Sequence, residues 1–275
     1  MSTLEKLCAM NIIRKLVLGL LISGSFVSFA QADTPPHCAA NAPWGLPQAA
    51  VPDSTLICRT GLALLHDNQA RIASWVSYVL NRERVLACAP RVDNFVPDPL
   101  LRPRARAEVS DYRRSGYDMG HMAPNADQSW NPTVQIESFY LSNVAPQLAS
   151  VNRGLWRELE SIVRSWAFER NNITVYVGSV YSADDKTIGA NRVIVPNAFY
   201  KIVVDNDRRV SLAFLFPHRD GLGDHIRTVQ TTVNHIQQVT NIVFPVPDNP
   251  AVMNTLWNID TRSLARARSE ICGRR

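Results

Sequence analysis

Hydrophobic residues gather in three short stretches of the C-terminal half, which we predict to be β-strands. Residues 174–177, 200–205 and 210–216 are rich in β-branched and aromatic side chains, the residue types enriched in strands. An Asp-Asn-Asp sequence at 205–207 separates the last two stretches, and short polar residues of this kind favour tight turns. The second and third strands are therefore predicted to form a hairpin.

Two other segments repeat their hydrophobic positions every three to four residues, which is the spacing of one face of an α-helix. The first segment carries Val151, Leu155, Leu159, Ile162, Val163 and Trp166. The second carries Ile226, Val229, Val233, Ile236 and Val239. We predict two amphipathic helices that bracket the strands, with Trp156 and Trp166 packed in the core, and hence a mixed α and β domain.

Polar residues at the start of each helical segment are predicted to cap it. Ser150 suits the N-cap of the first helix, and Asp224 suits that of the second. A continuous first helix places Asn152 in its first turn and Glu160 about two turns further along, a rise of roughly 12 Å. These two side chains then cannot both contact one ion directly.

Basic residues followed by an apolar run predict an export signal at the N-terminus. Arg14 and Lys15 precede the apolar residues 16–29, and Ala-Gln-Ala at 30–32 has the pattern of a signal-peptidase site. An uncleaved membrane anchor fits less well, because the run is shorter than the roughly 20 residues that span a bilayer. We predict a signal peptide at 1–32, a periplasmic or extracellular protein, and no stable membrane association after cleavage.

The rest of the chain is predicted to form one domain behind a short arm. Residues 33–54 are rich in proline and alanine with little periodicity, which favours an irregular N-terminal arm. Residues 55–275 contain no evident repeat or linker and are numerous enough to bury a core.

Four cysteines remain after the predicted leader: Cys38, Cys58, Cys88 and Cys272. An even number in an exported chain favours two disulfides, and reduced buried thiols are the alternative. No two of these residues have the spacing of a Cys-x-x-Cys zinc or redox motif. Three pairings are possible, and our working prediction joins Cys38 to Cys58 and Cys88 to Cys272.

The net positive charge of the chain is small, but several arginines lie close together in the sequence. The formal net charge is +5 for the whole sequence and +3 once residues 1–32 are removed. Five arginines precede the central part of the chain, at Arg102, Arg104, Arg106, Arg113 and Arg114. They predict a basic surface that attracts polyanions in a salt-dependent way, with a solvated arginine-rich loop as the plainer interpretation.

His121 and Asn152 are the candidate chemical groups of the central segment. A neutral imidazole is well matched to removing a proton from water near neutral pH. A neutral amide oxygen suits Mg²⁺, an ion that keeps several waters and needs few protein ligands. A base beside a lightly held Mg²⁺ suits phosphodiester hydrolysis, although each residue taken alone is more often an ordinary structural one.

The same segment resembles the DNA/RNA non-specific endonucleases of the ββα-metal class. The family's D-R-G-H signature is matched, except for its arginine, by Asp118-Met119-Gly120-His121, which Met122-Ala123-Pro124 follows. The next block of the family is matched by Tyr140-Leu141-Ser142-Asn143-Val144-Ala145-Pro146-Gln147. The third is matched by Asn152-Arg153-Gly154 and by Trp156 to Glu160. Residues 59–65, 75–78 and 194–201 resemble strands of the family, so the likeness extends over about residues 55 to 245.

The resemblance implies an α+β fold of the ββα-metal nuclease type, with a mainly antiparallel sheet flanked by helices. It implies that His121 is the general base and that Asn152 is the one direct Mg²⁺ ligand. Mn²⁺ is expected to be able to replace Mg²⁺, because a site of oxygen ligands and many waters discriminates poorly between such ions. Glu160 would hold metal-bound water, and Arg164 would support that network and the phosphate. Arg91 falls where the family has a phosphate-binding arginine.

Further contacts to the substrate are expected from Arg113, Arg114 and Asn143. Met119 departs from the family pattern, because a thioether cannot supply the charge of the usual arginine. Arg91, Arg113 or Arg114 is expected to compensate; lower turnover or a different hold on the substrate are the alternatives.

The function predicted from these features is an exported, metal-dependent endonuclease that cuts DNA and RNA with little sequence preference. The alternative from another class is a catalytically weakened protein of the same fold that binds or sequesters nucleic acid, and Met119 is its support. A phosphodiesterase for small phosphate esters is a third hypothesis. Members of the family can dimerise, so a homodimer is compatible with the sequence.

Overall fold

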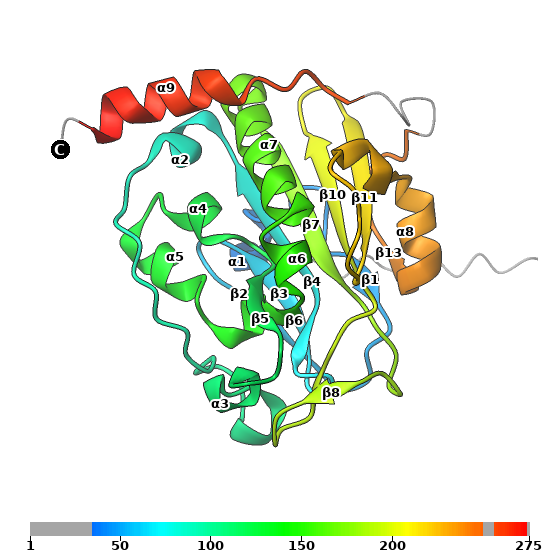
Figure 1. The fold of residues 1–275 in the computed structure, drawn as a ribbon. Coiled ribbons are helices and arrows are strands. Elements are labelled where there is room, and N and C mark those ends of the chain that lie inside the picture. The colour runs from blue at the N-terminus through cyan, green and yellow to red at the C-terminus, as the bar shows by residue number, and fades with distance from the viewer. Residues whose placement is uncertain (1–34, 250–255, 274–275) are drawn as a thin grey trace, which may run out of the picture. The chain divides into compact units, whose positions relative to one another are not determined.

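Within residues 35–249 and 256–273, which the computed structural model describes, seven antiparallel strands form the main sheet (Figure 1). Their order across the sheet is β12-β11-β10-β7-β4-β3-β2. The strands are β2 Ser54–Cys58, β3 Ala63–Asp67, β4 Ile72–Leu80, β7 Ile173–Val180, β10 Ala198–Asp205, β11 Val210–Pro217 and β12 Gln230–Thr231. The predicted signal peptide at 1–32 lies outside the described residues.

The three predicted strands are confirmed, each as part of a longer one. Residues 174–177 lie in β7, 200–205 in β10 and 210–216 in β11. The predicted hairpin is also confirmed, because β10 and β11 pair antiparallel with Asp205 opposite Val210. The mainly antiparallel α+β architecture agrees with the expectation from sequence.

Both faces of the sheet are buried. On β7, Val175 and Val177 belong to one hydrophobic cluster and Tyr176 to the other, as expected for side chains that alternate between faces. The first cluster contains Trp156 and Trp166, which are fully buried as predicted. The second cluster contains residues of the arm and of the C-terminal part. The sheet therefore lies between two layers of packing.

Helices and short strands surround the sheet (Figure 1). The α-helices are α1 Pro36–Ala39, α2 Arg82–Leu86, α3 Val109–Tyr112, α4 Asn125–Gln128, α5 Pro132–Glu137, α6 Ala149–Asn152, α7 Leu155–Arg170, α8 Val233–Thr240 and α9 Thr261–Cys272. The 3-10 helices are η1 Pro103–Ala105, η2 Leu141–Asn143 and η3 Ile226–Val229. The remaining strands pair as β1 Gln48–Ala49 with β13 Ile242–Val243, β5 Asp118–His121 with β6 Val144–Gln147, and β8 Thr187–Ile188 with β9 Val193–Ile194. The predicted arm at 33–54 thus contains α1 and β1, and its boundary stays a prediction.

The prediction of the second helix is wrong for its first half, residues 226–231. Residues 226–231 form η3 and β12, and the α-helix begins only after Thr232, whose side chain accepts a hydrogen bond from the backbone N–H of His235. The cap of η3 is His225 rather than Asp224. Ile226 and Val229 are buried in the first cluster and Val233 and Ile236 in the second, so a single hydrophobic period does not run through the segment.

The first predicted helix is interrupted. It divides into α6 and α7 at Arg153 and Gly154, so Asn152 ends a short helix instead of starting a long one, and Ser150 lies inside α6 rather than at its cap. A Cβ atom at Gly154 would collide with the carbonyl oxygen of Ser150. Glycine therefore permits the close approach that separates the two helices.

The two predicted disulfides are confirmed: Cys38 pairs with Cys58 and Cys88 with Cys272. The first bridge joins residues 20 apart in sequence, and the second joins residues 184 apart. The second bridge ties α9 to the segment that follows α2. Among the described residues, no helix is both long and apolar enough to cross a bilayer.

We expect the Cys88→Ser/Cys272→Ser protein to lose about 4–5 kcal/mol of unfolding free energy, because the longer cross-link removes more entropy from the unfolded chain. The Cys38→Ser/Cys58→Ser protein is expected to lose about 3 kcal/mol. Urea denaturation of both double variants measures the difference. An equal or larger loss in the Cys38→Ser/Cys58→Ser protein would contradict the loop-length argument.

Candidate active site

A cavity of about 430 Å³ lies where β5, α6 and α7 meet. Strand β5 pairs with β6, which leads directly into α6 and α7 (Figure 1). Its lining includes the predicted residues His121, Asn152, Glu160, Arg164 and Arg91. It also includes Phe95, Asp118, Met119, Pro124, Asn125, Ala126, Arg153 and Arg157.

His121 is the last residue of β5 and packs against two aromatic rings that also contact each other. The centroid of its ring lies 5.0 Å from that of Phe95 and 5.1 Å from that of Phe139. Burial, together with the nearby positive charge of Arg91, lowers the pKa of His121 to about 4, and the negative charge of Asp93 opposes the shift. The imidazole is therefore unprotonated at neutral pH, which is the form that can accept a proton.

Asn143 holds the chain that follows His121. Its Oδ1 accepts from the N–H of Ala123 at 2.9 Å, and its Nδ2 donates to the carbonyl oxygens of Ala123 at 2.8 Å and Ser138 at 2.9 Å. The side chain is fully buried, and its amide is occupied by protein groups. These contacts do not support the predicted contact of Asn143 with substrate; they hold the backbone two residues after His121.

Gly120 lies between Met119 and His121 because a side chain would not fit there. A Cβ atom at Gly120 would overlap the side chain of Gln147, which is fully buried on β6. Glycine at position 120 is thus required by packing across the β5 and β6 pair.

Asn152 faces the cavity with a fixed amide. Its Nδ2 donates to Oδ2 of Asp118 at 2.9 Å, and among the described residues no donor contacts its Oδ1. Burial opposes ionisation of Asp118, but hydrogen bonds from Arg153 and Asn152 hold its pKa below the usual value. Asp118 is therefore an anion that orients the amide and leaves the amide oxygen available.

Glu160 and Arg164 lie on one face of α7, four residues apart, and Arg164 is paired with the buried carboxylate of Asp127. Arg164 donates to Oδ1 of Asp127 at 2.9 Å, and the hydroxyl of Tyr78 donates to Oδ2 of Asp127 at 2.9 Å. Asp127 is fully buried, so this pairing anchors Arg164 from beneath. Burial raises the pKa of Glu160 to about 7, although Lys201 and Arg164 oppose the shift.

Lys201 was not predicted as a functional residue, and it lies behind this face of α7. Its side chain is fully buried, with Nζ 4.3 Å from the centroid of the Trp156 ring. Burial lowers the pKa of Lys201, while the negative charge of Glu160 counteracts that effect. The feature of the sequence that could have drawn attention to Lys201 is a charged residue inside the hydrophobic strand predicted at 200–205.

The oxygen donors of the cavity fit a magnesium ion. The free Oδ1 of Asn152 and the carboxylate of Glu160 both face the cavity, and hard oxygen ligands in small number suit an ion that keeps most of its waters. No group of three or more His, Cys, Asp or Glu side chains suited to an ion occurs among the described residues. A closed cage for a tightly held ion is thus not part of the described structure.

The remaining predicted residues differ in their positions. Arg91 lines the cavity, is paired with Asp93 at 2.6 Å, and lies over the Phe139 ring at 5.5 Å. Arg113 and Arg114 are exposed and are not among the residues that line the cavity. Met119 does line it, half-buried. Compensation for Met119 by Arg113 or Arg114 therefore has no support in the geometry.

Two cavity arginines were missed in the sequence. Arg153 pairs with Asp118 through two hydrogen bonds of 2.7 and 2.9 Å. Arg157 is exposed, and among the described residues it has no acidic partner. The sequence could have indicated Arg157, because residues 157, 160 and 164 share one polar face of the helix. The opposite face carries Leu159 and Ile162.

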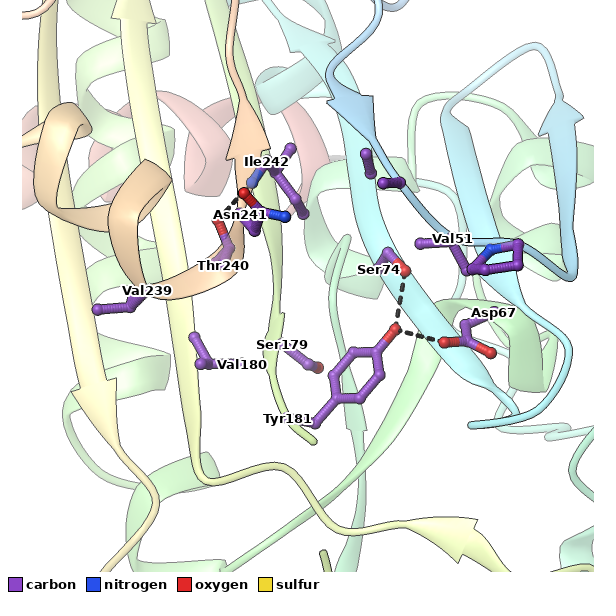
Figure 2. Close-up of a pocket in the computed structure, with 13 residues that line it drawn as sticks. Val51, Asp67, Ser74, Ser179, Val180, Tyr181, Val239, Thr240, Asn241 and Ile242 are labelled. Atoms are coloured by element: carbon purple, nitrogen blue, oxygen red, sulfur yellow. Dashed lines mark hydrogen bonds between the residues drawn. The ribbon is translucent and has the colours of Figure 1, made fainter. Parts of the chain in front are cut away.

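A second cavity of about 210 Å³ shares no lining residue with the first. Figure 2 shows Tyr181 reaching toward Ser74 and Asp67, with Thr240 and Asn241 on the other side. The Tyr181 hydroxyl forms hydrogen bonds with the hydroxyl of Ser74 at 2.8 Å and with the carboxylate of Asp67 at 3.0 Å. None of the residues predicted for catalysis lines this cavity, so the first cavity is the candidate active site.

The β5 and β6 pair followed by α6 and α7, with a histidine at the end of β5, defines a ββα-metal nuclease fold. The chain belongs to the DNA/RNA non-specific endonuclease family, whose model matches residues 45–249.

Relatives and a solved structure agree with this assignment. Human mitochondrial endonuclease G is 35% identical over 174 residues, which cover 59% of this chain and 57% of that protein. Human mitochondrial nuclease EXOG is 28% identical, with 75% and 61% covered. A nuclease of Nostoc sp. is 29% identical, with 76% and 80% covered. The chain thus spans about three fifths of the two human relatives.

The fold is also that of a chain in the crystal structure of the EndoG/EndoGI complex. The TM-score is 0.70 at 29% identity, and the match covers 77% of this chain and 92% of that one.

Proposed function

We propose that the protein is an endonuclease that hydrolyses phosphodiester bonds of DNA and RNA and depends on a divalent metal. One observation carries the proposal: a neutral imidazole, His121, and an amide with a free oxygen, Asn152, face the same cavity. Asp118 fixes the amide, and Asn143 fixes the chain beside the imidazole. Membership of the non-specific endonuclease family supports the same chemistry.

In this proposal each residue has a separate task. His121 accepts the proton of the attacking water. Asn152 would be the direct ligand of Mg²⁺ or Mn²⁺, and Glu160 would hold a water of that ion. When bound, the ion stabilises negative charge on the phosphate and the leaving oxygen. Arg164 and Arg91 hold the phosphate by charge-assisted hydrogen bonds.

The proposed substrates are polymers rather than small esters. Four arginines line the cavity: Arg91, Arg153, Arg157 and Arg164. Contacts to phosphate carry no sequence information, so an enzyme that grips only the backbone accepts both DNA and RNA. The alternative of a weakened nucleic-acid-binding protein rests on Met119, which leaves the family's arginine position uncharged.

The deciding experiment incubates plasmid DNA and total RNA with the purified protein in Mg²⁺, in Mn²⁺ and in EDTA. We expect both polymers to be cut in either metal and left intact in EDTA. Salt-sensitive binding without metal-dependent products would replace the proposal by the sequestering protein. Hydrolysis of bis(p-nitrophenyl) phosphate without cleavage of either polymer would favour the small-ester phosphodiesterase.

Arg157 is expected to bind substrate without taking part in the chemical step. The Arg157→Ala protein should show a several-fold higher KM for DNA with kcat changed little, and the slope of log K against log[salt] should fall by about one. Binding is measured by fluorescence anisotropy in EDTA. Arg266→Ala is the matched control, since Arg266 is an exposed arginine of α9 and its loss removes the same charge. Equal effects of the two substitutions would contradict a local role for Arg157.

Export and oligomeric state also stay proposals. The mature protein is proposed to begin at Asp33 and to act in the periplasm or outside the cell, and two disulfides support an oxidising compartment. The intact mass of protein recovered from the host periplasm and culture medium tests the cleavage site. Light scattering on the purified protein tests the homodimer.

A further inference from the structure

His218, which no proposed catalytic role uses, connects three separate parts of the fold. It lies just beyond β11, and its Nε2 accepts a hydrogen bond from the backbone N–H of Leu148 at 2.7 Å. Its Nδ1 is 2.6 Å from the carbonyl oxygen of Pro196. Its ring packs against Phe199, at 5.0 Å between centroids, and against Tyr117, at 5.7 Å.

These two hydrogen bonds determine which nitrogen of His218 carries the proton. A backbone N–H can only donate and a carbonyl oxygen can only accept, so Nε2 is unprotonated and Nδ1 carries hydrogen. Burial lowers the pKa of His218, although the bond to Pro196 and the charge of Asp220 oppose the shift. The neutral ring is therefore the form that fits both of its partners.

Leu148 is the N-cap residue of α6, the short helix that ends at Asn152. No side chain within α6 caps its start. A helix of four residues is not stable alone, so its position depends on contacts with the rest of the protein. Asn152 and Arg153 tie its C-terminal end to Asp118, which leaves its beginning to be fixed by other residues.

The loop that carries His218 also makes a second contact with α6. The hydroxyl of Ser150 donates to Oδ1 of Asp220. Both residues are exposed, so water competes for this bond, whereas His218 is half-buried between two aromatic rings. The bond from Leu148 to His218 is thus the better shielded of the two.

We propose that His218 is a positioning residue: by accepting the N–H of Leu148 it fixes the start of α6 and thereby the direction in which Asn152 presents its free oxygen to the cavity. The inference rests on the proposed role of Asn152 in metal binding. His218 itself does not line the cavity, so it acts only through α6.

The test compares His218→Leu, which removes the acceptor, with His218→Gln, whose amide oxygen can still accept from Leu148. His235→Gln is the matched control, because His235 is exposed on α8. Hydrogen exchange of the amides of residues 148–153 is measured without metal. Cleavage of plasmid DNA is then measured over a range of Mg²⁺ concentrations to separate the midpoint for Mg²⁺ from kcat at saturation.

We expect faster exchange at 148–153 in the His218→Leu protein and a Mg²⁺ midpoint raised about tenfold, with kcat at saturating Mg²⁺ changed little. The His218→Gln protein should remain within about threefold of the wild type. Unchanged exchange, a loss confined to kcat, or a His218→Gln protein as impaired as His218→Leu would overturn the proposal.

Two further outcomes are also informative. If His218→Leu does not fold, exchange and the Mg²⁺ midpoint of His218→Gln decide: values near the wild type support the proposal, and loss of both overturns it. If the wild type cuts no nucleic acid in any metal, the proposed function fails, while the exchange data alone still support or overturn the hold of His218 on α6.

Discussion

The His121→Ala protein is expected to cut plasmid DNA roughly 10²–10⁴-fold more slowly than the wild type at saturating Mg²⁺, the usual contribution of a general base. Binding of DNA in EDTA should be unchanged, because the cavity arginines remain. The environment of His121 supports this expectation: burial against Phe95 and Phe139 keeps the imidazole neutral, which preserves its ability to accept a proton. Initial rates and anisotropy titrations separate the two effects.

His235→Ala is the control for this substitution, since it removes an exposed histidine from α8. Circular dichroism should be recorded for both variants, because alanine at position 121 leaves a space beside two aromatic rings. A folded His121→Ala protein that retains more than about a tenth of the wild-type rate would exclude His121 as the general base.

The Asn152→Ala protein is expected to lose about 10²–10³-fold in rate, as when one group that stabilises developing charge is removed. Isothermal titration calorimetry should show weaker binding of Mn²⁺, because Asn152 offers a free amide oxygen to the cavity. The Asp118→Ala protein should show a smaller loss of about 10–100-fold, since Asp118 orients the ligand without being one.

Asn234→Ala, an exposed asparagine of α8, is the control for Asn152→Ala. Unchanged Mn²⁺ binding in the folded Asn152→Ala protein would rule out direct ligation by this residue. An Asp118→Ala loss as large as that of Asn152→Ala would mean that Asp118 does more than orient the amide.

The sequence predicted the strands better than the helices. Continuous runs of β-branched and aromatic residues mark β7, β10 and β11 clearly, because a strand buried on both faces is hydrophobic throughout. A helical period, in contrast, does not detect a break of two residues. The apolar positions 151 and 155 keep the same spacing across the junction at Gly154, and only the close approach to Ser150 explains the separation of α6 from α7.

The sequence also located most of the candidate site, but it did not separate ligands from supporting residues. A motif gives the position of Asn143 without telling whether its amide points inward or outward. The aromatic neighbours of His121 come from segments outside the motif, and their effect on its pKa depends on three-dimensional packing. No local pattern indicates His218, because its hydrogen bond to Leu148 joins residues 70 positions apart.

The bridge between Cys88 and Cys272 closes residues 88–272, which contain the candidate active site, into a covalent ring. Every residue proposed for catalysis, from Arg91 to Arg164, lies between these two cysteines, and so does His218. A protease that cuts one exposed loop inside the ring opens it without releasing a fragment, because the two pieces stay joined through sulfur. For a protein proposed to work outside the cytoplasm, a single cut inside this ring therefore leaves both pieces covalently joined until a reductant breaks the disulfide.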